Sequence, residues 1–325
     1  MPAPSPEIAR SLIAEVEVDP GEVAISPIPG GASRETWLVE ADGRDRRWVL
    51  RRDPEGSVSL VPIADEFALI ARAAEAGVPV PRPLALEPAG GRLNTAAILM
   101  PFIAGTSVGP RILRKPEFQR PRQRLTAQLG EALARIHGIE TASLAGVLPD
   151  AAGDPALAQI PEWERQLDEL GEPLPAVELG LRWLRAKAPE PAEPRLVHGD
   201  FRLGNFIVDE RGLAAVIDWE LAHLGDPAED IGWLCIRSWR FGNDDRPVAG
   251  VGRLDEFIEA YEAAGGAPVD RDRVRYWEVF GNVKWAVICA RQAHDHLTGV
   301  RRSHELASLG RRVCEPEWDM LELIL

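Results

Sequence analysis

Residues 196–230, LVHGDFRLGNFIVDERGLAAVIDWELAHLGDPAED, decide the fold of this chain. The motif H-G-D ends at Asp200, and Asn205 follows it by five residues. Asp218 comes 13 residues after Asn205, at the end of a second short apolar run. Because an Arg-Gly pair separates the two runs, the pattern predicts a β-hairpin within 205–217, with polar side chains at its ends.

These three polar residues match the needs of phosphoryl transfer. That reaction needs a carboxylate to accept the proton of a hydroxyl group, and oxygen ligands for the Mg²⁺ that neutralises the phosphates. Asp200 suits the first role, and Asn205 and Asp218 suit the second. The D-x-x-x-x-N spacing equals that of the protein-kinase catalytic loop. The alternative is a hairpin whose Asp and Asn side chains only cap turns.

The chain before this stretch reads as a small strand-rich lobe. Three β-type runs separated by Gly-bearing turns predict antiparallel hairpins, and a helix follows, with apolar residues at i, i+3 and i+7. The Pro-rich segment 78–83 must then be extended, and a further strand runs into a hinge. In order, these segments are 23–28, 36–39, 48–50, a helix through Phe67, Ile70 and Ala74 that stops at Gly77, the strand 96–102 and the hinge 103–105.

The chain after the hinge is mostly helical. Helical faces are predicted over 125–137, 176–187, 254–261 and 274–287, and a last helix through 306–313 is interrupted by Pro316. We therefore expect an α+β fold of two lobes, residues 1–103 and 104–325, with a small-molecule site in the cleft between them.

Composition narrows the class of protein. The 325 residues include 37 basic and 51 acidic ones, for a net charge of −14, which disfavours nucleic acid and anionic lipid as partners. No apolar run approaches the roughly 18 residues needed to cross a bilayer, and the first residues do not form a signal peptide, so we expect a cytoplasmic protein. Its three cysteines, Cys235, Cys289 and Cys314, are expected to be buried free thiols. A monomer and a homodimer both stay open.

The segment 196–230 resembles the aminoglycoside phosphotransferase and choline kinase-like family, which is distantly related to protein kinases. It is most similar to the kinase-like domains fused to some acyl-CoA dehydrogenases, and the resemblance extends over about 20–320. It implies a protein-kinase-like bilobal fold, ATP or GTP as co-substrate, Mg²⁺ as cofactor and a small-molecule hydroxyl as acceptor. Asp200 is then the catalytic base, Asn205 and Asp218 bind Mg²⁺, and His198 braces the loop.

The resemblance also implies a nucleotide site in the first lobe. The segment PGGAS, residues 29–33, matches the loop that covers the nucleotide, and Glu66 matches the acid that pairs with the phosphate-binding cation. Residues 100–103 would hold adenine through backbone groups at the hinge. The implied nucleotide-binding residues are Gly30, Gly31, Ser33, Arg51, Glu66, Met100, Phe102 and Ile103.

Two positions depart from the expected pattern. The family often has a lysine on the third strand, where this chain has Arg51, and its first lysine is Lys115. Arginine can bind phosphate with two nitrogens and also pair with Glu66. The second departure is the triplet D-W-E at 218–220, which replaces the protein-kinase D-F-G. Arg51 keeps one alternative open, a non-catalytic nucleotide-binding pseudokinase.

The acceptor site is the least determined part. By the resemblance, Asp230, Trp233, Arg237 and Trp239 would help wall it, although the same residues would also suit a helix with core tryptophans and surface arginines. The acceptor can be an aminoglycoside, a choline-like alcohol, a sugar, a macrolide or a hydroxyacyl thioester.

Two further motifs carry less weight. The G-x-S-x-G motif at 105–109 suggests a hydrolase, but the chain lacks the alternating βαβ pattern of that fold. His294 and His296 stand two apart and so would not face one another on a helix, which favours a helix end over a metal site.

Overall fold

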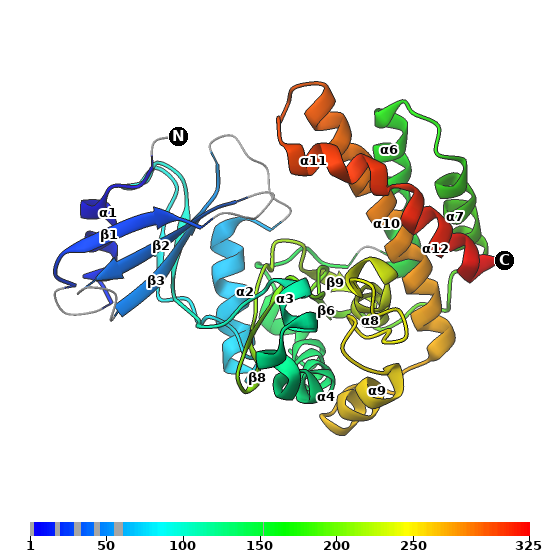
Figure 1. Cartoon of the computed structure of the whole chain (residues 1–325), viewed down its shortest axis with the longest axis horizontal. Helices are drawn as coiled ribbons and strands as arrows, with labels where there is room; N and C mark the ends of the chain where they lie inside the picture. The colour runs from blue at the N-terminus through cyan, green and yellow to red at the C-terminus, as the bar shows by residue number, and fades with distance from the viewer. Residues whose placement is uncertain (1–2, 17–19, 29–33, 42–45, 55–60, 152) are drawn as a thin grey trace.

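The computed structural model describes all residues except 1–2, 17–19, 29–33, 42–45, 55–60 and 152. A strand-rich part and a larger helical part lie side by side (Figure 1). The N-terminal helix and the strands β1–β3 lie at one end of the long axis, and the last helices lie at the other. Among the described helices, none combines the length and the hydropathy that crossing a bilayer requires.

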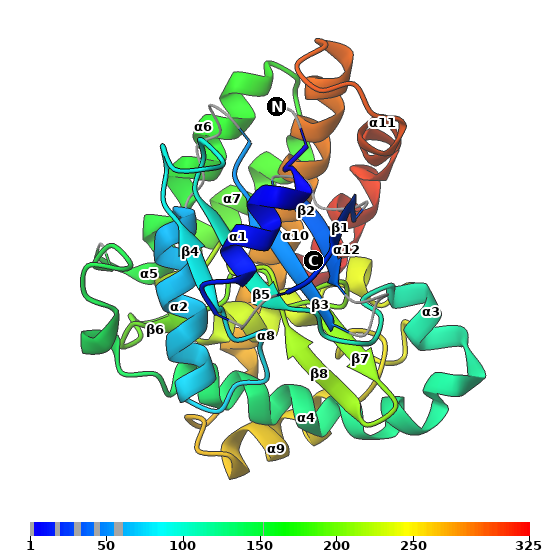
Figure 2. The same cartoon turned by 90° about the vertical axis from the view of Figure 1, so that its left-hand side faces the viewer.

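The first part is a five-stranded antiparallel sheet with the order β1-β2-β3-β5-β4. The helix α1 packs on one face and α2 on the other, and Figure 2 shows α1 in front of the strands. In β5, Leu99 contacts the α1 side, whereas Ile98 and Met100 belong to the α2 side, as the period of a strand requires. The elements are α1 (Pro6–Ile13), β1 (Val23–Pro27), β2 (Glu35–Ala41), β3 (Arg46–Arg52), α2 (Ile63–Glu75), β4 (Ala85–Glu87) and β5 (Ala97–Pro101).

The second part is built around the long helix α10, which packs against α6, α7, α8 and α12. Two small antiparallel pairs, β6–β9 and β7–β8, lie among the helices. The elements are α3 (Gly109–Arg114), α4 (Gln119–His137), α5 (Pro155–Ala158), α6 (Ile160–Leu170), α7 (Pro175–Ala186), β6 (Arg195–Val197), β7 (Phe206–Asp209), β8 (Gly212–Val216), β9 (His223–Gly225), α8 (Ala228–Cys235), α9 (Leu254–Ala263), α10 (Arg271–Leu297), α11 (His304–Leu309) and α12 (Cys314–Ile324).

One hydrophobic cluster joins the two parts. Leu69 and Ile70 of α2 belong to the same buried cluster as Leu125 and Leu129 of α4. Burial of this apolar surface stabilises the attachment of α2 to the helical part. The side chains at the start of α2 are thereby fixed relative to the hairpin β7–β8.

Most predicted elements are confirmed, including the hairpin β7–β8 and the helices α2, α4, α7, α9 and α10. Helix α1, which begins at the N-cap Ser5, and strand β4 were not predicted. The prediction that Pro316 interrupts the last helix was wrong: a 3₁₀ turn at Gly310–Arg312 makes the break, and Pro316 lies in the first turn of α12. The expectation of three buried thiols was also wrong, because Cys314 is exposed.

Candidate active site

The loop that carries Asp200 follows β6, and it is hydrogen-bonded to Asp230 in the first turn of α8. The Asp230 carboxylate accepts hydrogen bonds from the backbone N–H groups of His198 (2.7 Å) and Gly199 (2.9 Å), and it is fully buried. Gly199 has φ of +78°, and a Cβ there would lie 2.3 Å from the Leu221 carbonyl oxygen. Only glycine therefore allows this close approach of two backbones.

His198 braces the loop, as predicted. Its Nδ1 lies 3.2 Å from the backbone nitrogen of Asp200, and its Nε2 lies 3.2 Å from the Ile217 carbonyl oxygen. Burial lowers the pKa of this imidazole, so the neutral form is favoured. A neutral ring with its proton on Nε2 satisfies both contacts, because Nδ1 then accepts from Asp200 and Nε2 donates to Ile217. The histidine thus joins the loop to the end of β8.

The Asp200 carboxylate has three hydrogen-bond donors around it. Asn205 Nδ2 donates to Oδ2 at 2.6 Å, and both Arg202 Nε (2.9 Å) and Trp233 Nε1 (2.8 Å) donate to Oδ1. The side chain retains 12% exposure, so a hydroxyl group can reach it. Arg202 was not predicted, although a basic residue two positions after the aspartate was a visible signal.

Asn205 and Asp218 come together at the same end of the hairpin. The carbonyl of Asn205 accepts from the N–H of Ile217, the residue just before Asp218. Nδ2 of Asn205 is used by Asp200, so its amide oxygen is the atom that remains for a cation. Asp218 has φ of +71°, an uncommon value for a residue with a side chain, and such strain is concentrated at functional sites. An amide oxygen and a carboxylate are hard donors, which fits Mg²⁺.

Arg51 connects this end of the hairpin to α2. Its Nη1 lies 2.5 Å from Glu66 Oε1, and its Nη2 bonds to Asp218 and lies 3.3 Å from Glu220 Oε2. Although burial opposes its charge, Glu66, Asp218 and Glu220 together raise the pKa of the Arg51 guanidinium. The side chains of Glu66 and Arg51 are 0% and 12% exposed, so these charges are poorly screened by solvent.

A second arginine, Arg34, shares Glu66 with Arg51 and was not predicted. Arg34 bonds to Glu66 Oε2 and also donates to Asp53 (2.6 Å) and to the Val61 carbonyl (2.7 Å). Each oxygen of Glu66 therefore faces one guanidinium. The sequence offered one hint of a role for Arg34, its position directly after the segment 29–33. Its acceptors lie 19 to 32 residues further along the chain, so local sequence did not indicate them.

At the hinge, residues 100–103, some of the backbone groups predicted to bind adenine already have partners within the protein. The N–H of Phe102 donates to the Arg47 carbonyl, and the Arg47 guanidinium lies 4.1 Å from the centre of the Phe102 ring. Met100 pairs with Val49 of β3 and is buried. Within the described ranges, the backbone N–H of Ile103 has no protein acceptor. The predicted residues Gly30, Gly31 and Ser33 lie outside the described residues.

The four predicted acceptor residues fall into two pairs. Asp230 and Trp233 are buried and bond to the loop of Asp200 or to its carboxylate, which favours a positioning role over contact with an acceptor. Trp239 stacks under Arg202, with the guanidinium carbon 4.5 Å from the ring centre. Arg237 is paired with Asp244 and Asp319.

Arg237 also lines a cavity of about 580 Å³, between the 3₁₀ turn Arg237–Trp239 and the first turn of α12. Its walls include Arg114, Arg237, Ser238, Phe241, Trp318 and Asp319. Ser238 is buried, and its Oγ has no partner among the described residues. The residue that follows Ser238 in the chain is Trp239, whose ring contacts Arg202.

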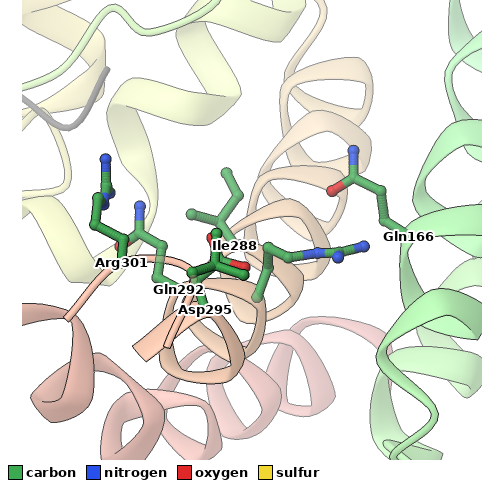
Figure 3. Close-up of a pocket in the computed structure, with 7 residues that line it drawn as sticks. Gln166, Ile288, Gln292, Asp295 and Arg301 are labelled. Carbon is green, nitrogen blue, oxygen red and sulfur yellow. The ribbon is translucent and has the colours of Figure 1, made fainter. Parts of the chain in front are cut away.

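A second cavity, of about 390 Å³, lies between α6 and the C-terminal half of α10 (Figure 3). Gln166 projects from α6, and Ile288, Gln292 and Asp295 belong to α10. None of the predicted site residues lines it. His294 and His296 occupy the last turn of α10, so the predicted helix end is confirmed.

The chain is similar to known proteins in sequence and in fold. Residues 24–277 match the model of the phosphotransferase enzyme family. Acyl-CoA dehydrogenase family member 10 of Mus musculus is 28% identical over 316 residues, which cover 92% of this chain and 29% of that protein. The chain therefore spans about three-tenths of the length of that relative.

Solved structures share the fold. A Ralstonia eutropha JMP134 protein, described as a candidate aminoglycoside phosphotransferase, superposes with a TM-score of 0.77 at 23% identity, over 98% of this chain and 97% of that one. Aminoglycoside 2'-phosphotransferase-IIIa, solved with GDP, superposes with a TM-score of 0.65 at 16% identity, over 97% and 98%. The predicted α+β, protein-kinase-like bilobal fold is confirmed.

Proposed function

Because the chain belongs to the phosphotransferase enzyme family, we propose that it moves the γ-phosphoryl group of ATP or GTP to a hydroxyl group of a small molecule, with Mg²⁺. One observation carries the proposal: a continuous set of contacts runs from Asp200 through Asn205 to the backbone beside Asp218, and from Asp218 through Arg51 to Glu66. A base, two hard oxygen ligands and a phosphate-binding cation are thus assembled from both parts of the chain.

The roles follow from these contacts. Asp200 accepts the proton of the acceptor hydroxyl, and Asn205 and Asp218 would hold Mg²⁺ through their side-chain oxygens. Bound Mg²⁺ would neutralise charge on the phosphates. Arg51 binds the phosphates, and Glu66 keeps its guanidinium in place.

The same proposal divides the chain by role. Residues 1–103 hold the nucleotide, and residues 104–325 carry the base and the acceptor site. Backbone groups at Met100, Phe102 and Ile103 would meet the adenine or guanine ring, and Gly30, Gly31 and Ser33 would cover the phosphates. The cavity lined by Arg237 and Ser238 is the proposed acceptor site, because the next residue, Trp239, contacts Arg202, and Arg202 contacts Asp200.

The test is a thermal-shift titration with ATP or GTP, each with and without Mg²⁺. A ligand that binds only the folded state stabilises it by about 2.7 kcal/mol at a hundredfold excess over its Kd. We expect a metal-dependent rise in Tm for the wild type that Asp218→Ala removes. Asp209→Ala, at the other end of the same hairpin, is the matched control and should retain the rise.

Turnover separates an enzyme from the pseudokinase alternative. We expect Asp200→Ala to bind Mg²⁺ and nucleotide as the wild type does but to stop forming nucleoside diphosphate in a screen of hydroxyl acceptors. Nucleotide binding without turnover in the wild type would support the pseudokinase, and unaltered turnover in Asp200→Ala would disprove the assignment of the base.

A further inference from the structure

Trp233, on α8, differs from its aromatic neighbours in having a partner for its indole N–H. Trp233, Trp239 and Trp285 form one aromatic cluster, with ring centres 4.8 to 6.5 Å apart. Trp239 Nε1 and Trp285 Nε1 are buried and have no partner in the part of the chain that the structure describes. Trp233 Nε1 instead donates to Asp200 Oδ1 at 2.8 Å. This contact therefore reaches the proposed base directly.

The two oxygens of Asp200 are occupied unequally. A carboxylate oxygen has about two lone-pair sites for hydrogen bonds. Oδ1 accepts from both Trp233 Nε1 and Arg202 Nε, so both of its sites are used. Among the described residues, Oδ2 accepts only from Asn205 Nδ2, at 2.6 Å. One site on Oδ2 is therefore left for a proton from an acceptor.

Trp233 is itself held on its other side by Lys284 of α10. The Lys284 ammonium lies 4.7 Å from the centre of the Trp233 ring and donates to the Gly199 carbonyl at 2.9 Å. It also lies 3.9 Å from Glu229 Oε1, and both Lys284 and Glu229 are buried. A buried ring between a cation and a second indole has little freedom to turn, so its N–H points steadily at Asp200.

We propose that Trp233 is a positioning residue that reserves Asp200 Oδ2 for the proton of the acceptor hydroxyl; this role rests on the proposed phosphotransfer. In that step the acceptor oxygen forms a bond to the γ-phosphorus, while the bond between the γ-phosphorus and the β,γ-bridging oxygen breaks. The nucleoside diphosphate leaves with that electron pair, and the hydroxyl proton passes to Oδ2. Trp233 acts through Asp200, by fixing the rotation of the carboxylate.

The kinetic test uses Trp233→Phe, which keeps an aromatic ring against Lys284 and Trp239 but removes the N–H. Trp285→Phe is the matched control, because it removes an N–H that has no partner in the same cluster. We expect kcat to fall about tenfold in Trp233→Phe, the loss of one hydrogen bond to a charged group, with the KM for nucleotide unchanged. Trp285→Phe should keep kcat within about twofold. An unchanged kcat in Trp233→Phe, or an equal fall in both variants, would overturn the proposal.

A second measurement detects the hydrogen bond without any activity. In a ¹H–¹⁵N spectrum of the full chain, the indole signal missing from Trp233→Phe identifies Trp233. Asp200→Asn replaces the anionic acceptor by a neutral one, which weakens the bond, and should move that signal upfield. A signal that does not respond to Asp200→Asn would overturn the inference. If Trp233→Phe fails to fold, triple-resonance assignment of the wild type identifies the Trp233 signal instead, and the test still holds. By contrast, a wild type that never forms nucleoside diphosphate, with the indole signal responding, would refute the proposed function while leaving the hydrogen bond established.

Discussion

Replacing Asp230 by Asn should be among the most damaging conservative changes in this chain. The carboxylate is fully buried and accepts from two backbone N–H groups of the proposed catalytic loop and from His137 Nε2 at 3.2 Å. An asparagine can present one neutral oxygen to these donors, and it turns an NH₂ group toward another. A hydrogen bond to a charged group contributes about 1.5–3 kcal/mol, and an unpaired buried N–H costs about 1–3 kcal/mol. We therefore expect Asp230→Asn to lower the free energy of unfolding by about 3–5 kcal/mol.

Urea denaturation monitored by circular dichroism measures this loss. Typical domains unfold with about 5–15 kcal/mol, so the variant should remain folded in the absence of urea. Asp255→Asn is the control, because the Asp255 side chain is 46% exposed and pairs with Arg271 and Arg253, so this change should have little effect. A loss in Asp230→Asn no larger than in Asp255→Asn would refute the view that Asp230 supports the loop.

The difference in the free energy of unfolding between the wild type and Asp230→Asn should also depend on pH. Although burial opposes its charge, hydrogen bonds from His137 and the backbone hold the pKa of Asp230 below its ordinary value. A depressed pKa contributes stability that is fully present above the ordinary value, near pH 4, and is lost as the pH falls through the folded-state pKa. The difference between the wild type and Asp230→Asn should therefore be constant above about pH 5 and shrink below about pH 4. A difference that grows on acidification would contradict this account.

Three further changes test other parts of the structure. Arg51→Met should weaken binding of the Mg²⁺–nucleotide complex at least about tenfold, as titration calorimetry would show, because charge-assisted phosphate contacts are lost; unchanged affinity would contradict the role of Arg51. Burial raises the pKa of Glu278 to about 7, although Glu278 contacts Arg240. The stability that the protonated Glu278 side chain contributes is therefore fully present below about pH 4.5 and is lost as the pH rises through 7. Glu278→Gln should remove that decline, making the variant more stable than the wild type at pH 8 by up to about 3 kcal/mol and similar at pH 4.5, which urea denaturation at both pH values would measure. Gly232→Ala should destabilise by about 1–3 kcal/mol in the same assay, because the new Cβ would lie 2.5 Å from the backbone of Trp277.

The parts of the site that were predictable are those encoded locally. The order of Asp200, Asn205 and Asp218 lies within 19 consecutive positions, and a single hairpin brings Asn205 and Asp218 together. The pairing of Glu66 with Arg51 was also expected, but that expectation came from a resemblance and not from spacing. Local sequence therefore predicts chemistry well where one supersecondary unit holds it.

The parts that escaped prediction depend on tertiary packing. Trp233 was predicted to wall the acceptor site, but its bond to Asp200 was not predicted. It lies 33 residues after Asp200, and only the placement of α8 against the loop turns its indole toward the base. Arg34 similarly reaches Glu66 across 32 residues. The exposure of Cys314 depends on which face of α12 packs against α10 and α7. In each case the side chain alone suits several environments, and the fold selects one of them.

The two departures from the kinase pattern meet in the structure. Arg51 stands where a lysine is usual, Glu220 stands where D-F-G has glycine, and Arg51 Nη2 lies 3.3 Å from Glu220 Oε2. The fork of a guanidinium lets one nitrogen face Glu66 while the other faces Asp218 and Glu220, a span that the single nitrogen of lysine does not offer. With a glycine at position 220, Arg51 Nη2 would keep Asp218 as its single acceptor among the described residues. The arginine and the extra glutamate are therefore in contact with each other, and Asp218 shares the same guanidinium nitrogen.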